Sequence, residues 1–193
     1  MDAVLISIGL VSLAEIGDKT MLLAIALAAT WRRPTPIVLG ILAATLVNHA
    51  FAAVAGVLAA QYLEGPWMRW VVGIAFLGFA VWALIPDTLE LDQAEQAEKS
   101  AWGVFWTTTA AFFLVEMGDK TQVATVALGA RFDNLFAVTM GTTLGMMIAN
   151  VPAVLFGEAL AKKVPMRALQ VGAALLFLLL GLWMLAGLQG WLG

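Results

Sequence analysis

The six residues from Glu15 to Thr20, with the sequence EIGDKT, place three charged side chains inside an apolar stretch. A near copy, EMGDKT, runs from Glu116 to Thr121, so the offset between the copies is 101 residues. The same offset aligns three further pairs without a gap: Gly40 with Gly141, Gly56 with Gly157, and Trp82 with Trp183. Chance is a poor explanation for a repeated six-residue motif in corresponding segments. We therefore expect two structurally similar halves.

The composition indicates an integral membrane protein. Of the 193 residues, 62% are hydrophobic and 12% are charged, whereas a soluble domain is usually about half apolar and about a quarter charged. The apolar runs are too long and continuous for barrel strands, which favours an all-α fold. The sequence has no cysteine for thiolate metal sites, a single histidine, and no basic run that suggests a nucleic-acid partner.

Six apolar segments are long enough to cross about 30 Å of hydrocarbon as helices. They are Ala3–Ala29, Pro36–Ala60, Trp67–Ile85, Ala101–Ala130, Leu135–Ala161 and Met166–Leu188. Residues 1–86 form the predicted first repeat, 87–100 an acidic cytoplasmic linker, and 101–193 the second repeat. Because three spans per half make the second half enter the bilayer from the opposite side, the prediction is six transmembrane helices in two inverted-topology three-helix repeats.

The distribution of lysine and arginine predicts the orientation. With both termini outside, six of these residues lie in or beside inner loops and two beside outer loops: Arg32, Arg33, Lys99, Lys162, Lys163 and Arg167 against Arg69 and Arg131. Cytoplasmic loops are enriched in positive charge, so we expect a multi-pass protein with N-out and C-out topology. Its short loops are typical of a bacterial inner-membrane protein.

The repeated motifs concentrate charge near the predicted bilayer centre. In a continuous helix, Glu15 and Asp18 share one face and Lys19 lies four residues from Glu15; Glu116, Asp119 and Lys120 repeat this arrangement. Each ionisable group at that depth costs roughly 2.5–3.5 kcal/mol, so these groups should face one another, water or an ion. Four carboxylates and two ammonium groups sum to −2, which one divalent cation or two protons would neutralise.

The residues next to these charges differ between the copies. Position 21 is Met, and its repeat partner is Gln122. The Gln122 carbonyl oxygen suits a hard divalent ion, whereas a Met21 thioether ligand would favour manganese over calcium or magnesium. The alternative for Met21 is simple packing. Inside the motifs, Gly17 and Gly118 would let a facing helix approach closely.

Five other polar residues are candidates for supporting roles. Thr20 and Thr121 can offer hydroxyl oxygens or hydrogen-bond to their own helix, and we favour the second role. Asn48, His49 and Asn150 lie inside apolar spans, where they can complete an ion's coordination shell or join helices. We favour the structural role for each, although His49 could also relay protons.

The doubled motif resembles the hallmark of a family of small six-span cation exchangers. That family includes bacterial manganese exporters and eukaryotic Golgi manganese/calcium–proton exchangers, and the resemblance covers essentially the whole chain. It implies export of Mn²⁺ from the cytoplasm, with the ion bound by Glu15, Asp18, Glu116 and Asp119, and with Gln122 as an additional ligand. No cofactor is implied; the transported ion is Mn²⁺ or Ca²⁺, and the counter-ion is H⁺ or Na⁺.

The paired acidic residues would also suit two functions other than manganese export. A calcium/proton exchanger of the same family has the same carboxylates, and the asymmetry between Met21 and Gln122 argues against it. A metal-dependent membrane lipid phosphatase or phosphotransferase also needs paired acids, but it should carry a basic patch for phosphate near one membrane face. The only mid-span cations in the sequence are Lys19 and Lys120, so we expect a transporter rather than an enzyme. The oligomeric state is left open.

Overall fold

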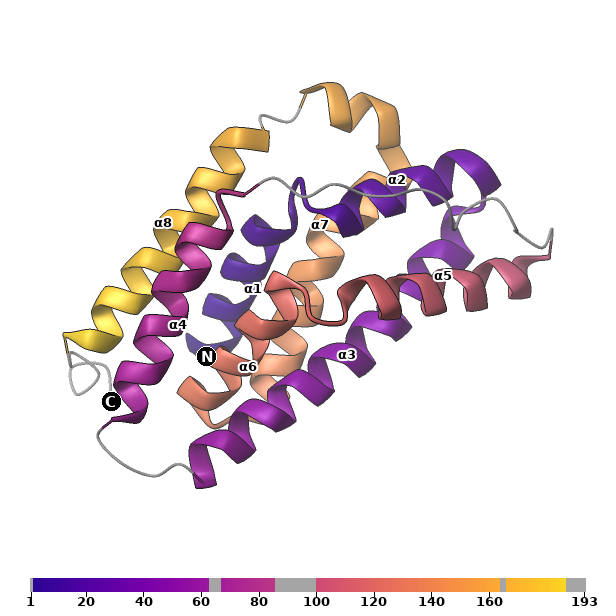
Figure 1. The fold of residues 1–193 in the computed structure, drawn as a ribbon. Coiled ribbons are helices and arrows are strands. Elements are labelled where there is room, and N and C mark those ends of the chain that lie inside the picture. The colour runs from indigo at the N-terminus through magenta and orange to yellow at the C-terminus, as the bar shows by residue number, and fades with distance from the viewer. Residues whose placement is uncertain (1, 63–66, 86–99, 164–165, 187–193) are drawn as a thin grey trace.

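The computed structural model describes residues 2–62, 67–85, 100–163 and 166–186, and every regular element in these ranges is a helix. The predicted acidic linker therefore lies almost entirely outside the described residues. Four helices come from each half of the chain (Figure 1). They are α1 (Asp2–Glu15), α2 (Lys19–Trp31), α3 (Pro34–Tyr62), α4 (Met68–Trp82), α5 (Ala101–Glu116), α6 (Lys120–Phe132), α7 (Leu135–Lys163) and α8 (Met166–Leu185).

The prediction of continuous helices over Ala3–Ala29 and Ala101–Ala130 was wrong, because each segment breaks at its motif. The chain passes through Gly17 with a φ of 90° and through Gly118 with a φ of 75°, a region that glycine enters without steric cost. Asp18 and Asp119 then cap the next helices with extended backbone. The other four predicted spans correspond to α3, α4, α7 and α8, with ends that agree within three residues.

These breaks also correct the role predicted for the motif glycines. We expected Gly17 and Gly118 to permit close approach of a facing helix. A Cβ added at Gly118 would instead meet no atom within 4 Å, so its positive φ, rather than close packing, requires glycine there. The same positive φ occurs at Gly17.

The two halves share their local structure at the offset of 101 residues. Helices α2 and α6 both contain 13 residues. Each of them also ends at a non-glycine residue in the left-handed region, Arg32 with a φ of 50° and Asp133 with a φ of 46°. Helices α3 and α7 correspond to each other, but α7 is kinked at Gly157, with a φ of 18° and a ψ of −98°. The breaks and caps of the short helices therefore recur together.

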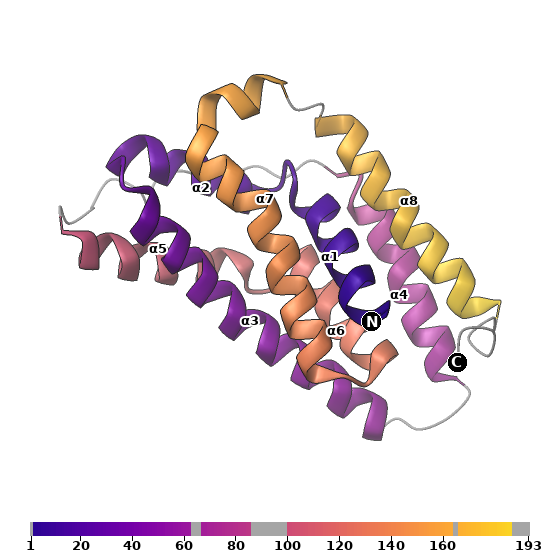
Figure 2. The same cartoon turned by 180° about the vertical axis from the view of Figure 1, so that it is seen from behind.

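The halves are interleaved, since each long helix packs against the broken helices of the other half. Helix α7 contacts α1 and α2, α3 contacts α5 and α6, and the pairs α3–α7 and α4–α8 also pack together (Figures 1 and 2). A Cβ added at Gly141 would meet Val4 and Ser7, and one at Gly40 would meet Phe105 and Thr108. These contacts are equivalent at the offset of 101, so the two copies pack in the same register.

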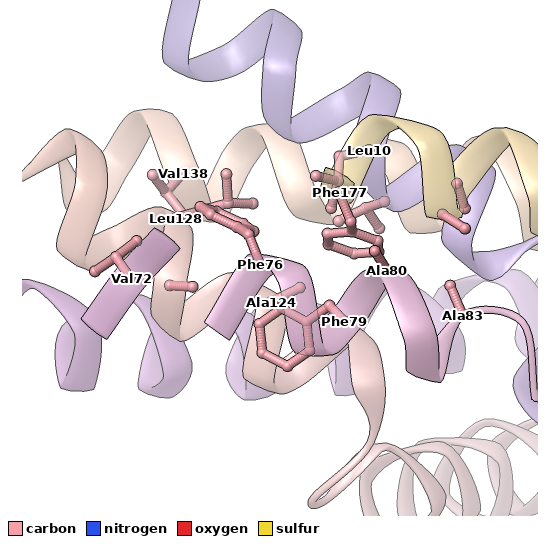
Figure 3. Packing of buried hydrophobic residues seen from close by; sticks show 14 of the residues in the cluster. Leu10, Val72, Phe76, Phe79, Ala80, Ala83, Ala124, Leu128, Val138 and Phe177 are labelled. Carbon is pink, nitrogen blue, oxygen red and sulfur yellow. The ribbon is translucent and has the colours of Figure 1, made fainter. Parts of the chain in front are cut away.

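The buried apolar side chains form two clusters. One joins α4 and α8 to α1, α6 and the first turns of α7, and Phe76, Phe79 and Phe177 lie at its centre (Figure 3). The other surrounds α2, α3 and α5. By length and composition, two described helices could cross a membrane, over Pro34–Gln61 and Leu135–Gly157, and shorter apolar helices cover Lys19–Trp31, Trp70–Trp82 and Gln170–Leu185.

The crossing of α3 and α6 provides a prediction about stability. A Cβ at Gly56 would collide with the backbone carbonyl of Val126 and lie 2.8 Å from the Ala130 nitrogen. Backbone atoms in two packed helices cannot move apart cheaply, so we expect Gly56→Ala to destabilise the fold by about 2 kcal/mol. In purified protein, the thermal unfolding midpoint should fall by about 5 °C.

The matched control for this prediction is Gly9→Ala, because a Cβ at Gly9 meets nothing within 4 Å. Alanine is the better helix former by about 1 kcal/mol, so this variant should be at least as stable as the parent protein. Equal midpoints for the two variants would contradict the close crossing.

Candidate ion-binding site at the helix breaks

The two motifs meet in the interior of the bundle. Glu15 and Glu116 are the last residues of α1 and α5, and Asp18 and Asp119 are the N-cap residues of α2 and α6. All four carboxylates are at most 3% exposed. The breaks thus place in the interior all four acidic residues that we expected to share one site.

The lysines pair across the halves instead of within their own motifs. Lys19 Nζ lies 2.7 Å from Asp119 Oδ1, and Lys120 Nζ lies 4.0 Å from Asp18 Oδ1. Lys120 Nζ also donates a hydrogen bond of 2.9 Å to the Ile85 carbonyl at the end of α4. The predicted arrangement of each acid pair and its lysine on one helix face is therefore wrong, because the break removes the helical spacing on which it depended.

The two glutamates also contact the opposite half. Thr121 Oγ1 donates a hydrogen bond of 3.0 Å to Glu15 Oε2, and His49 Nε2 lies 3.6 Å from Glu116 Oε1. Within the described residues, both Glu116 oxygens and Glu15 Oε1 accept no hydrogen bond. A buried carboxylate without such partners is costly as an anion, so a cation or a proton is the chemical complement of these oxygens.

Gln122 occupies a hydrogen-bond network at the second break. Its Oε1 accepts a hydrogen bond of 2.7 Å from the Gly118 nitrogen, and its Nε2 donates one of 2.9 Å to Asn48 Oδ1. Asn48 Nδ2 donates in turn to the Phe113 carbonyl at 3.1 Å. In this arrangement Gln122 and Asn48 join α3, α5 and α6, which is the structural role that we favoured for Asn48.

The remaining candidates differ in what surrounds them. Met21 is fully buried in the apolar cluster around α2, α3 and α5, as expected for a packing residue. Asn150 donates to the Met146 carbonyl in its own helix. Thr121 donates to a carboxylate and not to its own helix, and the Thr20 hydroxyl makes no hydrogen bond within the described residues. The backbone role favoured for the two threonines is therefore wrong for Thr121.

The helix ends add electrostatic asymmetry to the site. Asp18 and Asp119 lie at helix N-termini, where the partial positive charge of the peptide dipoles favours a carboxylate. Glu15 and Glu116 lie at helix C-termini, where the partial negative charge adds to their own and favours a cation. Within the described ranges, no three acidic or histidine side chains are close enough together to hold a metal in this arrangement.

Two features of the site were not found from the sequence. The Ile85 carbonyl, which accepts from Lys120, carries no side-chain signal. The helix breaks did have a signal, because Gly followed by Asp before a helical run is typical of a turn with an N-cap. The apolar pattern on both sides of that signal concealed it.

Comparisons with known proteins match nearly the whole chain. The profile of a family described as "Divalent cation/proton antiporter GDT1" matches residues 3–91 and 104–190. A Vibrio cholerae protein named "Putative manganese exporter" is 48% identical over 183 residues, which cover 94% of this chain and 90% of the relative. A GDT1-like protein of Synechocystis is 29% identical over 88% of the chain and 90% of its own length. GDT1-like protein 5 of Arabidopsis thaliana is 28% identical over 91% and 92%. No solved structure matches.

Proposed function

Because the chain belongs to the GDT1 family of divalent cation/proton antiporters, and is therefore a membrane transporter and not an enzyme, we propose that it exports Mn²⁺ from the cytoplasm in exchange for protons. The observation that carries this proposal is the buried group of four carboxylates at two helix breaks, with lysines paired across the halves. The name of the Vibrio cholerae relative supports manganese as the ion.

The proposed membrane arrangement has six spans in two inverted repeats. Helices α1 and α2 together form one broken span, as do α5 and α6, and α3, α4, α7 and α8 form the other four. The recurrence of the helix breaks, of the short helices α2 and α6, and of their caps at an offset of 101 residues supports this arrangement. Secondary transporters bind their substrates at such broken helices near the bilayer midplane. The excess of positive residues in inner loops supports N-out and C-out topology in a bacterial inner membrane.

The lysines act as internal counter-ions in the proposed mechanism. Lys19 neutralises Asp119, and Lys120 lies beside Asp18, so the charge that remains is that of Glu15 and Glu116. This charge of −2 is balanced by one Mn²⁺ or by two protons. An empty, fully ionised site is the unfavourable alternative, because burial penalises uncompensated charge. The two repeats then rock around the occupied site, which faces one side of the membrane at a time.

The choice of ion depends on the oxygen ligands. Met21 packs in an apolar cluster, so its thioether is not available to favour manganese in this arrangement. Carboxylates alone suit both Mn²⁺ and Ca²⁺. A calcium/proton exchanger is therefore the second candidate function, and Na⁺ is the alternative counter-ion.

Inside-out vesicles provide the test, because export from the cell appears there as uptake. We expect Mn²⁺ uptake to begin when the vesicle interior is made acidic, and to stop when an ionophore collapses the proton gradient. Vesicles without the protein are the control. Uptake of Ca²⁺ but not Mn²⁺ would identify the second candidate, and uptake that follows a sodium gradient would replace the proton as counter-ion. Uptake of neither metal would contradict the proposal.

A further inference from the structure

Arg131, in the last turn of α6, lies against two aromatic rings. Its guanidinium carbon is 4.4 Å from the centre of the Trp183 ring in α8 and 5.2 Å from that of Phe132. The side chain is half-buried, and its Nε makes no hydrogen bond within the described residues. Cation–π attraction to Trp183 therefore ties the end of α6 to α8.

The two ends of the bundle are closed to different degrees. At the end where α6 terminates, α4 packs against α6, and α8 packs against α1. The equivalent pairs at the opposite end, α8 with α2 and α4 with α5, make at most marginal contact in the described part of the chain. In both views, α2 and α5 extend away from α4 and α8 (Figures 1 and 2). The contacts of α4 and α8 with the rest of the bundle therefore do not follow the symmetry of the repeat.

One pair of equivalent glycines shows the same difference in detail. A Cβ at Gly56 in α3 would collide with the Val126 carbonyl of α6. At the equivalent position in the other half, a Cβ at Gly157 would come no closer than 3.7 Å to Ile25 in α2. Gly157 also lies at a kink in α7, with a φ of 18° and a ψ of −98°. The helix crossing is therefore close at the Arg131 end, and looser at the other end, where α7 bends.

The position equivalent to Arg131 in the first half carries no cation. At the offset of 101 residues, Arg131 corresponds to Thr30, and Trp183 corresponds to Trp82. Thr30 is exposed, and its hydroxyl donates a hydrogen bond of 2.9 Å to the Ala26 carbonyl of its own helix. At this position, only the second copy of the repeat therefore carries a cation.

We propose that Arg131 is a one-sided latch that stabilises this conformation by tying the end of α6 to the packed pair of α4 and α8 through Trp183. The proposal rests on alternating access between the repeats, as in the function proposed above. In the opposite state, which we call the exchanged state, each repeat would make the contacts that the other makes here. Helix α4 would then pack against α5, α8 would pack against α2, and Arg131 would move away from Trp183. On the proposed orientation, the latched end is external. Arg131 thereby acts as a positioning residue, since it sets the balance between the two states without touching the ion.

The absence of native cysteine from the sequence allows a direct test with single introduced thiols. Ala127 in α6 is 7% exposed within the cluster beneath α4 and α8, and its repeat equivalent is Ala26 in α2. Ala127→Cys and Ala26→Cys would be placed in separate proteins in nanodiscs and labelled with a charged maleimide. We expect Arg131→Thr to increase the labelling rate at position 127 about tenfold, because loss of a partly buried cation–π contact shifts an equilibrium by about this factor. The same substitution should decrease the labelling rate at position 26.

Two further variants distinguish a latch from general loosening. Arg131→Lys keeps a cation and should retain part of the protection. Adding Thr30→Arg to Arg131→Thr moves the cation to the other repeat. There it would meet Trp82 in the exchanged state, and it should lower labelling at position 26 further. Unchanged rates, or faster labelling at both positions, would overturn the latch. Labelling requires no ion flux, so a failure of Mn²⁺ transport would contradict the proposed function and leave this readout standing.

Discussion

Glu116→Gln is expected to reduce the initial rate of Mn²⁺ transport at least about 100-fold. Mutation of a residue that only hydrogen-bonds to a metal ligand already lowers metal affinity or activity about 10–100-fold, and Glu116 is a proposed ligand itself. Glu116 is 1% exposed, and neither of its oxygens accepts a hydrogen bond within the described residues. Glutamine has nearly the same shape but no charge. The substitution therefore changes the summed site charge from −2 to −1, which a divalent ion no longer balances, while the fold should persist.

The rate would be measured as Mn²⁺ uptake into inside-out vesicles with an imposed proton gradient. Asp133→Asn is the matched control, because it also removes one carboxylate charge, at an exposed helix cap with a φ of 46°. Asparagine tolerates that left-handed conformation, so this variant should transport at the wild-type rate. If Glu116→Gln transported within twofold of wild type, Glu116 would not belong to the ion path.

Lys19→Gln is expected to destabilise the ion-free protein by about 2 kcal/mol. This is less than the loss of one partner from a fully buried ion pair costs, because the Lys19 side chain is 24% exposed. Lys19 Nζ lies 2.7 Å from Asp119, whose side chain is 2% exposed. Without that ammonium group, the Asp119 charge is buried beside the other carboxylates. The same change should tighten Mn²⁺ binding, because the metal no longer competes with a tethered cation.

Thermal unfolding with and without Mn²⁺ measures both effects. The unfolding midpoint of Lys19→Gln should fall in the absence of metal and recover as Mn²⁺ is added, since a ligand that binds only the folded state stabilises it. The double variant Lys19→Gln with Asp119→Asn should recover stability without metal. Exposed Arg33→Gln is the charge-matched control and should change neither quantity. An unaltered midpoint for Lys19→Gln without metal would contradict the crossed pair.

Part of the fold was predictable because the apolar pattern reports burial directly. The segments that became α3 and α7 were predicted from hydropathy alone and differ from the observed helices by at most two residues at either end. The broken helices were not predicted, although the same pattern runs through them. Hydropathy does not report backbone torsion, and the break depends on the positive φ of Gly17 and Gly118.

The candidate site shows a similar division. The repeat predicted that the two motifs would meet, and the lysine of each motif does lie beside the buried aspartate of the other. Helical spacing, however, predicted the wrong partners for Lys19 and Lys120. An arrangement in which each lysine contacts the aspartate about 100 residues away arises only when two breaks face each other. The hydrogen bonds of Gln122 to Gly118 and Asn48 depend on the same arrangement.

The membrane class, the repeat and the composition of the charged site could be read from the amino-acid sequence, because they follow from residue type and spacing along the chain. The folded arrangement was needed to learn which lysine faces which aspartate, where the broken helices turn, and at which end of the bundle α4 and α8 pack against α6 and α1. These features depend on torsion angles and on packing between distant segments, and two equivalent repeats permit two such packings. The six residues from Glu15 to Thr20 therefore specify a charged helix break, while their copy in the other half supplies the counter-charges.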